Sequence, residues 1–325
     1  MMMKKRIKFI LLSLSLLSII FFGFLFTAVS ASTTYQLGLT KSTDEYTVIQ
    51  YNDDGWKTTI NPALNSKEYF EGDANVTGAK SKQTIKGWVD QTYSTYDALL
   101  SLYFSFIEYG LWNLFLVNLT AAGYNETTIN ANYTNTYDAW YGVSAEWWFT
   151  DGEFEETPNN TISPIIIMKD PSAYKSILDD CNAIIEDVST DPAINISIRI
   201  PFSTISNKTA DEFLWQLVFY GFGVAQPATD YLNEVITEIA CTNTTTSGST
   251  LIFEKAGVTD YTVEVSYGSK GIMTSFVVKD DVGEIIYQIT SSNADWIFFT
   301  ILISVIACSV AIITYVVVRN RKLKK

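Results

Sequence analysis

The chain has 325 residues, of which 47% are apolar and 14% aromatic, and a formal net charge of −13. It contains no histidine, which excludes Ser-His-Asp and Cys-His catalytic sets and zinc sites with imidazole ligands. Between apolar runs near the two ends lie 13 basic and all 35 acidic side chains, a formal charge of −22. Such a charge repels nucleic acid, so no nucleic-acid partner is expected.

The chain begins with four basic residues within positions 4–8, an apolar run over residues 9–27, and small residues up to Ala31. This order is typical of a secretory signal peptide over residues 1–31, with cleavage after Ala31. The apolar run is long for a signal peptide, so an uncleaved anchor is the alternative. In both cases the residues that follow are exported.

Residues 34–89 are rich in tyrosine, threonine, valine and tryptophan. The stretch EYTVIQYNDDGWKTTI alternates through Tyr46, Val48 and Gln50 and then reaches turn-forming residues at 52–55. This pattern predicts strands joined by a hairpin turn.

The apolar stretch YDALLSLYFSFIEYGLWNLFLVNLT, residues 96–120, resembles a membrane span. Four polar residues within it share one narrow helical stripe, namely Asp97, Ser101, Ser105 and Glu108. A helix facing lipid would not carry two carboxylates on such a stripe without partners. We therefore expect a long, mostly buried ectodomain helix over residues 97–118 that ends near Gly123.

The apolar surface of this expected helix has two interpretations. A filled core is the simpler one. The other is an apolar cavity that takes a lipid or another hydrophobic ligand. The candidate ligand-binding residues are then Phe104, Glu108, Trp112 and Phe115.

The rest of the ectodomain gives clearer signals. YDAWYGVSAEWWFTDGEF predicts a strand pair that turns at Asp151 and Gly152. Three helices are expected after Asp170 and Pro171, after the Thr209–Glu212 capping box, and after Pro227. Residues 261–290 alternate like a meander of three strands with two turns.

Residues 296–318 carry no charged side chain and are followed at once by five basic residues. This predicts a transmembrane helix over residues 295–318 and a basic cytoplasmic tail over residues 319–325. The expected fold class is α+β: an extracellular antiparallel-sheet ectodomain over residues 32–294, packed on a long apolar helix and further helices, plus that one C-terminal span.

Eight N-x-[ST] sequons lie on both sides of the 96–120 stretch, as one exported domain requires. They are Asn75, Asn118, Asn125, Asn132, Asn159, Asn195, Asn207 and Asn243.

Cys181 and Cys241 are the only cysteines in the predicted exported part. An oxidising exterior allows a disulfide between them, and two separately buried thiols are the alternative.

Two short motifs bear on chemistry. The acidic turn TDGEFEETPNN could coordinate Ca²⁺ through Asp151, Glu153, Glu155 and Glu156, and a solvated hairpin loop is the simpler interpretation. SAYK, residues 172–175, has the S-x-x-K spacing, which is common by chance. We expect no other cofactor, and we expect that the protein is not an enzyme.

The order of signal, acidic sequon-rich ectodomain, single span and basic tail resembles the membrane-anchored surface glycoproteins of archaea. The stretch YFEGDANVTGAKSKQTIKGW is similar to segments of such proteins, although the P-G-F tripeptide of the sorted class is absent before the span. The resemblance implies a single-pass membrane protein of type I topology. We expect its ectodomain to bind an extracellular protein or another ligand near the membrane, and the alternative is a carrier of lipid or hydrophobic ligands.

Overall fold

A computed structural model describes residues 34–38, 41–62, 76–103, 116–150, 152–159, 165–192, 194 and 207–292. Contacts divide the chain into two units, Met1–Tyr35 and Gln36–Lys325. The fold below is that of the second unit. The predicted signal peptide and the predicted span over residues 295–318 lie outside the described residues.

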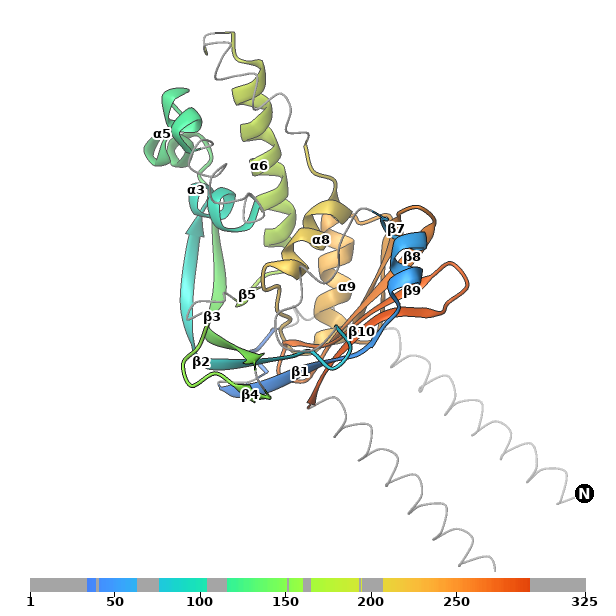
Figure 1. Ribbon diagram of the computed structural model, residues 1–325. Coiled ribbons are helices and arrows are strands. Elements are labelled where there is room, and N and C mark those ends of the chain that lie inside the picture. Colours follow the sequence, from blue (N-terminus) through green and yellow to red (C-terminus); the bar gives the residue numbers. More distant parts are fainter. Residues whose placement is uncertain are drawn as a thin grey trace, which may run out of the picture. The chain divides into compact units, whose positions relative to one another are not determined.

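Ten strands form one antiparallel sheet, which confirms the mixed α+β class (Figure 1). Nine of them are hydrogen-bonded in the order β4-β3-β2-β1-β10-β9-β8-β7-β6, and β5 pairs with β3. The strands are β1 (Ser42–Tyr51), β2 (Lys80–Ser94), β3 (Thr136–Thr150), β4 (Glu153–Phe154), β5 (Ile165–Met168), β6 (Thr244–Ser247), β7 (Thr250–Ala256), β8 (Asp260–Tyr267), β9 (Met273–Asp280) and β10 (Ile285–Ser291).

The first and last strands, β1 and β10, pair at the centre of this sheet. β1 pairs with β10 on one side and with β2 on the other, so Tyr46 lies opposite both Ser291 and Ser81. β2 and β3 are each 15 residues long and pair from Ser81–Trp148 to Ser94–Thr136, with a register shift between Ile85 and Gly87. Residues 80–85 of β2 pair with β1. Beyond the register shift, residues 139–142 of β3 pair with β5.

Several strand predictions are confirmed. β8, β9 and β10 are the expected meander, and β3 and β4 are the expected strand pair, with Gly152 at a φ of +88°. The predicted hairpin turn at residues 52–55 is wrong. Asn52 instead caps the short helix α2 (Asp53–Thr59), accepting a hydrogen bond from the backbone N–H of Gly55 at 3.0 Å.

The three predicted helices are confirmed at their expected starts. They are α6 (Ser172–Thr190), α8 (Ala210–Phe219) and α9 (Ala228–Ile239). α8 begins at the predicted capping box, in which Thr209 and Glu212 bond to each other's backbone N–H groups. The apolar face of α6 is completely buried from Tyr174 to Val188.

The two described ends of the predicted helix over residues 97–118 are helical. α3 (Thr95–Ala98) begins at a capping box between Ser94 and Asp97 and continues as the π-helix η2 (Leu99–Tyr103). Residues 116–121 are helical as well, and Gly123 follows them with a φ of +85°. Leu99 and Tyr103 are completely buried, so the start of this helix packs into filled core.

The side chain of Gln216 joins that start to α8. Its amide donates to the carbonyl oxygens of Leu102 at 2.8 Å and Tyr103 at 2.9 Å, where the π-helix ends. A further short helix, α5 (Glu126–Asn132), follows the 116–121 segment.

α8 and α9 lie against one face of the strands β7–β10 (Figure 1). The ring of Trp215 on α8 packs against Phe253 of β7 at 5.0 Å and Phe276 of β9 at 6.4 Å between ring centroids. Among the described residues, no helix combines the length and hydrophobicity that crossing a bilayer requires.

Candidate functional site

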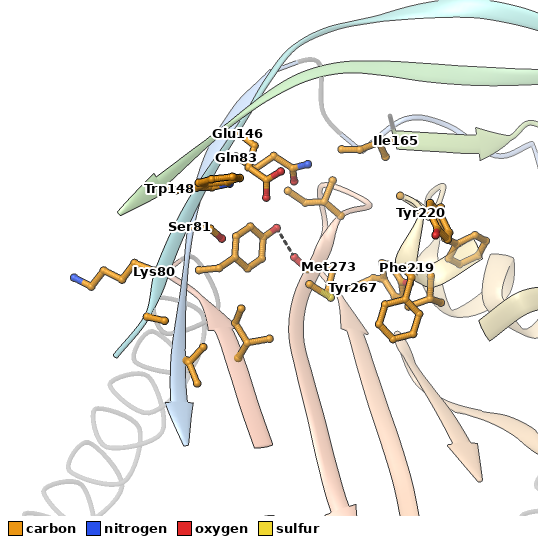
Figure 2. Close-up of a pocket in the computed structure, with 18 of the residues that line it drawn as sticks. Lys80, Ser81, Gln83, Glu146, Trp148, Ile165, Phe219, Tyr220, Tyr267 and Met273 are labelled. Atoms are coloured by element: carbon orange, nitrogen blue, oxygen red, sulfur yellow. Dashed lines mark hydrogen bonds between the residues drawn. The ribbon is translucent and has the colours of Figure 1, made fainter. Parts of the chain in front are cut away.

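An open cleft of about 560 Å³ lies on the same face of the sheet as α8. Its walls come from β1, β2, β3, β9 and β10 and from the end of α8 (Figure 2). The lining is mostly aromatic and aliphatic, and its volume is in the usual range for a small-molecule site. The lining residues are Tyr46, Val48, Ala79, Lys80, Ser81, Gln83, Glu146, Trp148, Ile165, Val218, Phe219, Tyr220, Gly221, Phe222, Tyr267, Ile272, Met273, Tyr287 and Ile289.

The two sides of the cleft differ in character. Figure 2 shows Trp148, Gln83 and Glu146 together on one side, where β2 and β3 are paired in register. The other side is formed by Phe219 and Tyr220 at the end of α8, with exposed fractions of 57% and 38%. The cleft thus has a polar end on the sheet and an exposed aromatic edge on the helix.

The position of Phe219 follows from how α8 ends. The helix stops at Phe219, and Gly221 follows with a φ of +95°, a left-handed conformation that favours glycine. The chain then turns into an extended segment in which Phe222 bridges to Ile166 of β5. Phe219 stays in place through ring contacts with Trp215 at 4.7 Å and Phe276 at 5.9 Å.

The tyrosines in the cleft are neutral at physiological pH. Burial, followed by the carboxylates of Asp44 and Glu146, raises the pKa of Tyr46 above its ordinary value. Its hydroxyl donates a hydrogen bond of 2.9 Å to the carbonyl oxygen of Met273. Burial also raises the pKa of Tyr287. These rings therefore present apolar surface rather than charge to the cleft.

No family model matches the chain, and no curated protein or solved structure is significantly similar to it.

The sequence-predicted ligand residues Phe104, Glu108, Trp112 and Phe115 lie outside the described residues. The cleft was not expected from the sequence, because its residues come from strands far apart along the chain. Tyr46 and Met273, for example, are 227 positions apart. The local signals were the alternation of Tyr46 and Val48 in β1 and of Ser81 and Gln83 in β2. Such alternation shows which residues share a face but not what lies opposite.

The predicted calcium ligands belong to the β3–β4 turn. Glu153, Glu155 and Glu156 are exposed, and Asp151 lies outside the described residues. In the part of the chain that the structure describes, no three Asp, Glu or Cys side chains are grouped closely enough to hold a metal ion.

Cys181 and Cys241 are both free thiols. The structure thus has the two separate thiols that the sequence left as the alternative to a bridge. Cys181 lies on the buried face of α6, where burial raises its pKa well above the ordinary value. Burial and then the nearby Asp211 raise the pKa of Cys241 to about 12, so both thiols stay protonated at neutral pH.

The serine and the lysine of the S-x-x-K motif each bond to a different aspartate. The hydroxyl of Ser172 donates to Asp170 at 2.7 Å, and the ammonium of Lys175 pairs with Asp179 one turn further along α6. The lysine is therefore not directed at the serine it would have to deprotonate.

The sequons differ in exposure. Asn118 is half-buried, and Asn75 and Asn195 lie outside the described residues. The remaining five are exposed, namely Asn125, Asn132, Asn159, Asn207 and Asn243.

Asp211 fixes the loop that follows α9. Its two carboxylate oxygens accept hydrogen bonds from the backbone N–H and hydroxyl of Thr242, the N–H of Asn243 and the hydroxyl of Thr244, at 2.6–3.0 Å. Partial burial opposes ionisation, but these four hydrogen bonds outweigh it and lower the pKa of Asp211 below 3.8.

This lowered pKa predicts a pH dependence. The folded chain holds Asp211 ionised more readily than the unfolded chain does, so its contribution to stability is complete above pH ~4 and is lost as the pH falls through the folded pKa. We expect the difference in unfolding free energy between the wild type and Asp211→Asn to shrink below pH ~4. Urea unfolding between neutral and acidic pH measures it, and a difference that does not change with pH contradicts the prediction.

Proposed function

We propose that this protein is a membrane-anchored surface protein without catalytic activity, whose exported domain binds an apolar ligand in the cleft on its sheet. The ligand class is an acyl chain or a similarly elongated hydrocarbon. The C-terminal segment, residues 295–318, anchors the protein in a type I topology, and the basic tail stays in the cytoplasm.

The cleft is the observation that carries the binding function. An open cavity of about 560 Å³ with walls of tyrosine, phenylalanine, isoleucine and valine removes hydrocarbon from water. Phe219, which is 57% exposed, is a large aromatic side chain left at the edge of that cavity. Water contact with such a surface is unfavourable, so a hydrocarbon that covers it is stabilised there.

The polar end of the cleft fits the head of such a ligand. Gln83 supplies an amide that can donate and accept hydrogen bonds, and Glu146 lies opposite it on β3. An alcohol, an amide or a protonated fatty acid presents an uncharged polar group to this end, with its chain directed toward Phe219.

Two observations support export. The five exposed sequons lie on the surface of one folded domain, as glycosylation requires. The region between the two apolar runs carries a formal charge of −22, which keeps a surface domain soluble. The absence of histidine and the separate pairing of Ser172 and Lys175 argue against hydrolysis.

A photo-crosslinking experiment tests the binding function. Membranes carrying the full chain are incubated with palmitate that bears a diazirine group, irradiated, and the modified peptides are identified by mass spectrometry. We expect adducts on peptides that contain Tyr46, Phe219 or Met273. In Ser81→Trp the indole fills the cleft beside Tyr46, and the adduct yield should fall about tenfold.

Thr43→Trp is the matched control. It adds the same side chain to β1 at an exposed position on the opposite face of the sheet. The control should label like the wild type. Equal labelling in Ser81→Trp, or adducts spread evenly over both faces, would refute the proposed cleft. Extraction of the wild-type chain from membranes by alkaline carbonate would refute the anchoring instead.

A further inference from the structure

The two faces of β2 carry different chemistry. Ser81 and Gln83 point to the cleft, and strand alternation directs the side chains of Lys80 and Lys82 to the opposite face, although Lys80 also contributes to the rim of the cleft. Figure 2 shows the Lys80 side chain directed away from the cleft. The region between the apolar runs has 13 basic and 35 acidic residues. Two lysines at neighbouring positions on one face of a strand therefore differ from the acidic character of the region as a whole.

Both lysines on this opposite face lie over aromatic rings of β3 and β4. The Lys82 ammonium is 4.7 Å from the Trp147 ring centroid and 4.6 Å from that of Phe154. The Lys80 ammonium is 5.1 Å from the Phe149 centroid, and Phe149 packs edge-on against Phe154 at 5.2 Å. All five side chains are half-buried. We call them the basic aromatic patch.

The strand register places this patch near the end of β10. Thr290 lies opposite Thr47, and Thr47 lies opposite Lys80, so Lys80 is two strand spacings, or roughly 10 Å, from Thr290 across the sheet. β10 ends at Ser291, four residues before the predicted span. The four Cα–Cα steps from Ser291 to residue 295 reach at most ~14 Å, so an anchor that begins there would hold the patch close to the bilayer surface.

We propose that the basic aromatic patch is a membrane-binding surface that rests on anionic lipid headgroups beside the C-terminal anchor. Lysines with long apolar stems and aromatic rings are the side chains that favour the bilayer interface. The ammonium groups contact lipid phosphates while the rings reach the boundary of the hydrocarbon. The proposal rests on the anchoring argued above and is independent of the cleft's ligand.

Glu45 provides an internal test of the charge argument. This exposed residue lies opposite Lys82 across β1 and β2, on the same face as the patch. Its carboxylate weakens the attraction of the patch for anionic lipid. Glu45→Lys should therefore strengthen membrane contact, and reversing the charge of both patch lysines should weaken it.

The experiment measures how close the patch comes to lipid in the intact protein. The full chain, with Cys241 and Cys308 replaced by serine, is placed in lipid nanodiscs and labelled with a fluorophore at Glu155→Cys, next to Phe154. Buried Cys181 remains unlabelled. A matched probe at Val282→Cys, 76% exposed in the turn before β10, reports on the opposite end of that strand. A lipid with a spin-labelled headgroup quenches whichever probe it approaches.

We expect strong quenching at position 155 and weak quenching at position 282 in discs that contain anionic lipid. Each lysine near such a surface contributes about fivefold, so Lys80→Glu with Lys82→Glu should weaken the contact about 25-fold or more. Glu45→Lys should increase the quenching. Equal quenching at the two probes, or no response to these charge changes, would overturn the proposal. A chain that fails to enter the discs would refute the anchor instead.

Discussion

Replacing Asp180 with alanine is expected to destabilise the protein by about 3 kcal/mol. One carboxylate oxygen of Asp180, on α6, accepts hydrogen bonds from Thr95 at 3.2 Å, Asn135 at 2.9 Å and Tyr137 at 2.6 Å. Thr95 and Tyr137 are almost completely buried, so their hydroxyl groups would lose a charged acceptor that water replaces only in part. The free energy of unfolding, from urea titration followed by tryptophan fluorescence, measures the loss.

Asp179→Ala is the control for this prediction. Asp179 is the preceding residue on α6, its side chain is 57% exposed, and it forms an ion pair only one turn away, with Lys175. An exposed pair of this kind contributes at most about 0.5 kcal/mol. Similar losses in the two variants would show that Asp180 acts merely as a surface charge rather than as the link between α6, α3 and β3.

Residue patterns predicted those elements whose signals are local. The Thr209–Glu212 capping box predicted the start of α8, because both of its hydrogen bonds form within four residues. β6 and β7 had no such signal, since TTTSGSTLIF is mostly polar at the edge of the sheet, and they were not predicted.

The turn predicted at residues 52–55 was wrong because asparagine fits both a turn and a helix cap at Asn52. In the structure Asn52 caps the helix α2, and α2 packs on the sheet through contacts such as that of Trp56 with Tyr287.

The candidate site was less predictable than the fold for the same reason. The polar end of the cleft comes from β2 and β3, its edge from the end of α8, and most of its remaining wall from β1, β9 and β10. Pairing β1 with β10 brings these parts together across most of the chain. Sequence periodicity indicates which side chains share a face, but not which distant strand or helix faces them. The most apolar stretch between the two ends, residues 97–118, is the stronger local signal, so the sequence predicted a ligand site there and not at this cleft.

Replacing Phe213 with alanine is expected to cost about 4 kcal/mol of unfolding free energy. Phe213 lies on the inner side of α8, is completely buried, and packs against Tyr103 of the π-helix at 6.2 Å between ring centroids. Its removal leaves a cavity between α8 and the start of the 97–118 segment, next to the Gln216 hydrogen bonds that join the same two elements. Urea unfolding of the full chain measures the effect.

Phe219→Ala removes the same side chain from the same helix at a position that is 57% exposed. Because Phe219 is more than half exposed and packs against the rings of Trp215 and Phe276, we expect about 1 kcal/mol of destabilisation. Photo-crosslinking by diazirine palmitate should nevertheless fall in Phe219→Ala, since the aromatic edge of the cleft is lost. A Phe219→Ala variant with full crosslinking, or one as unstable as Phe213→Ala, would mean that the end of α8 serves the core and not the ligand.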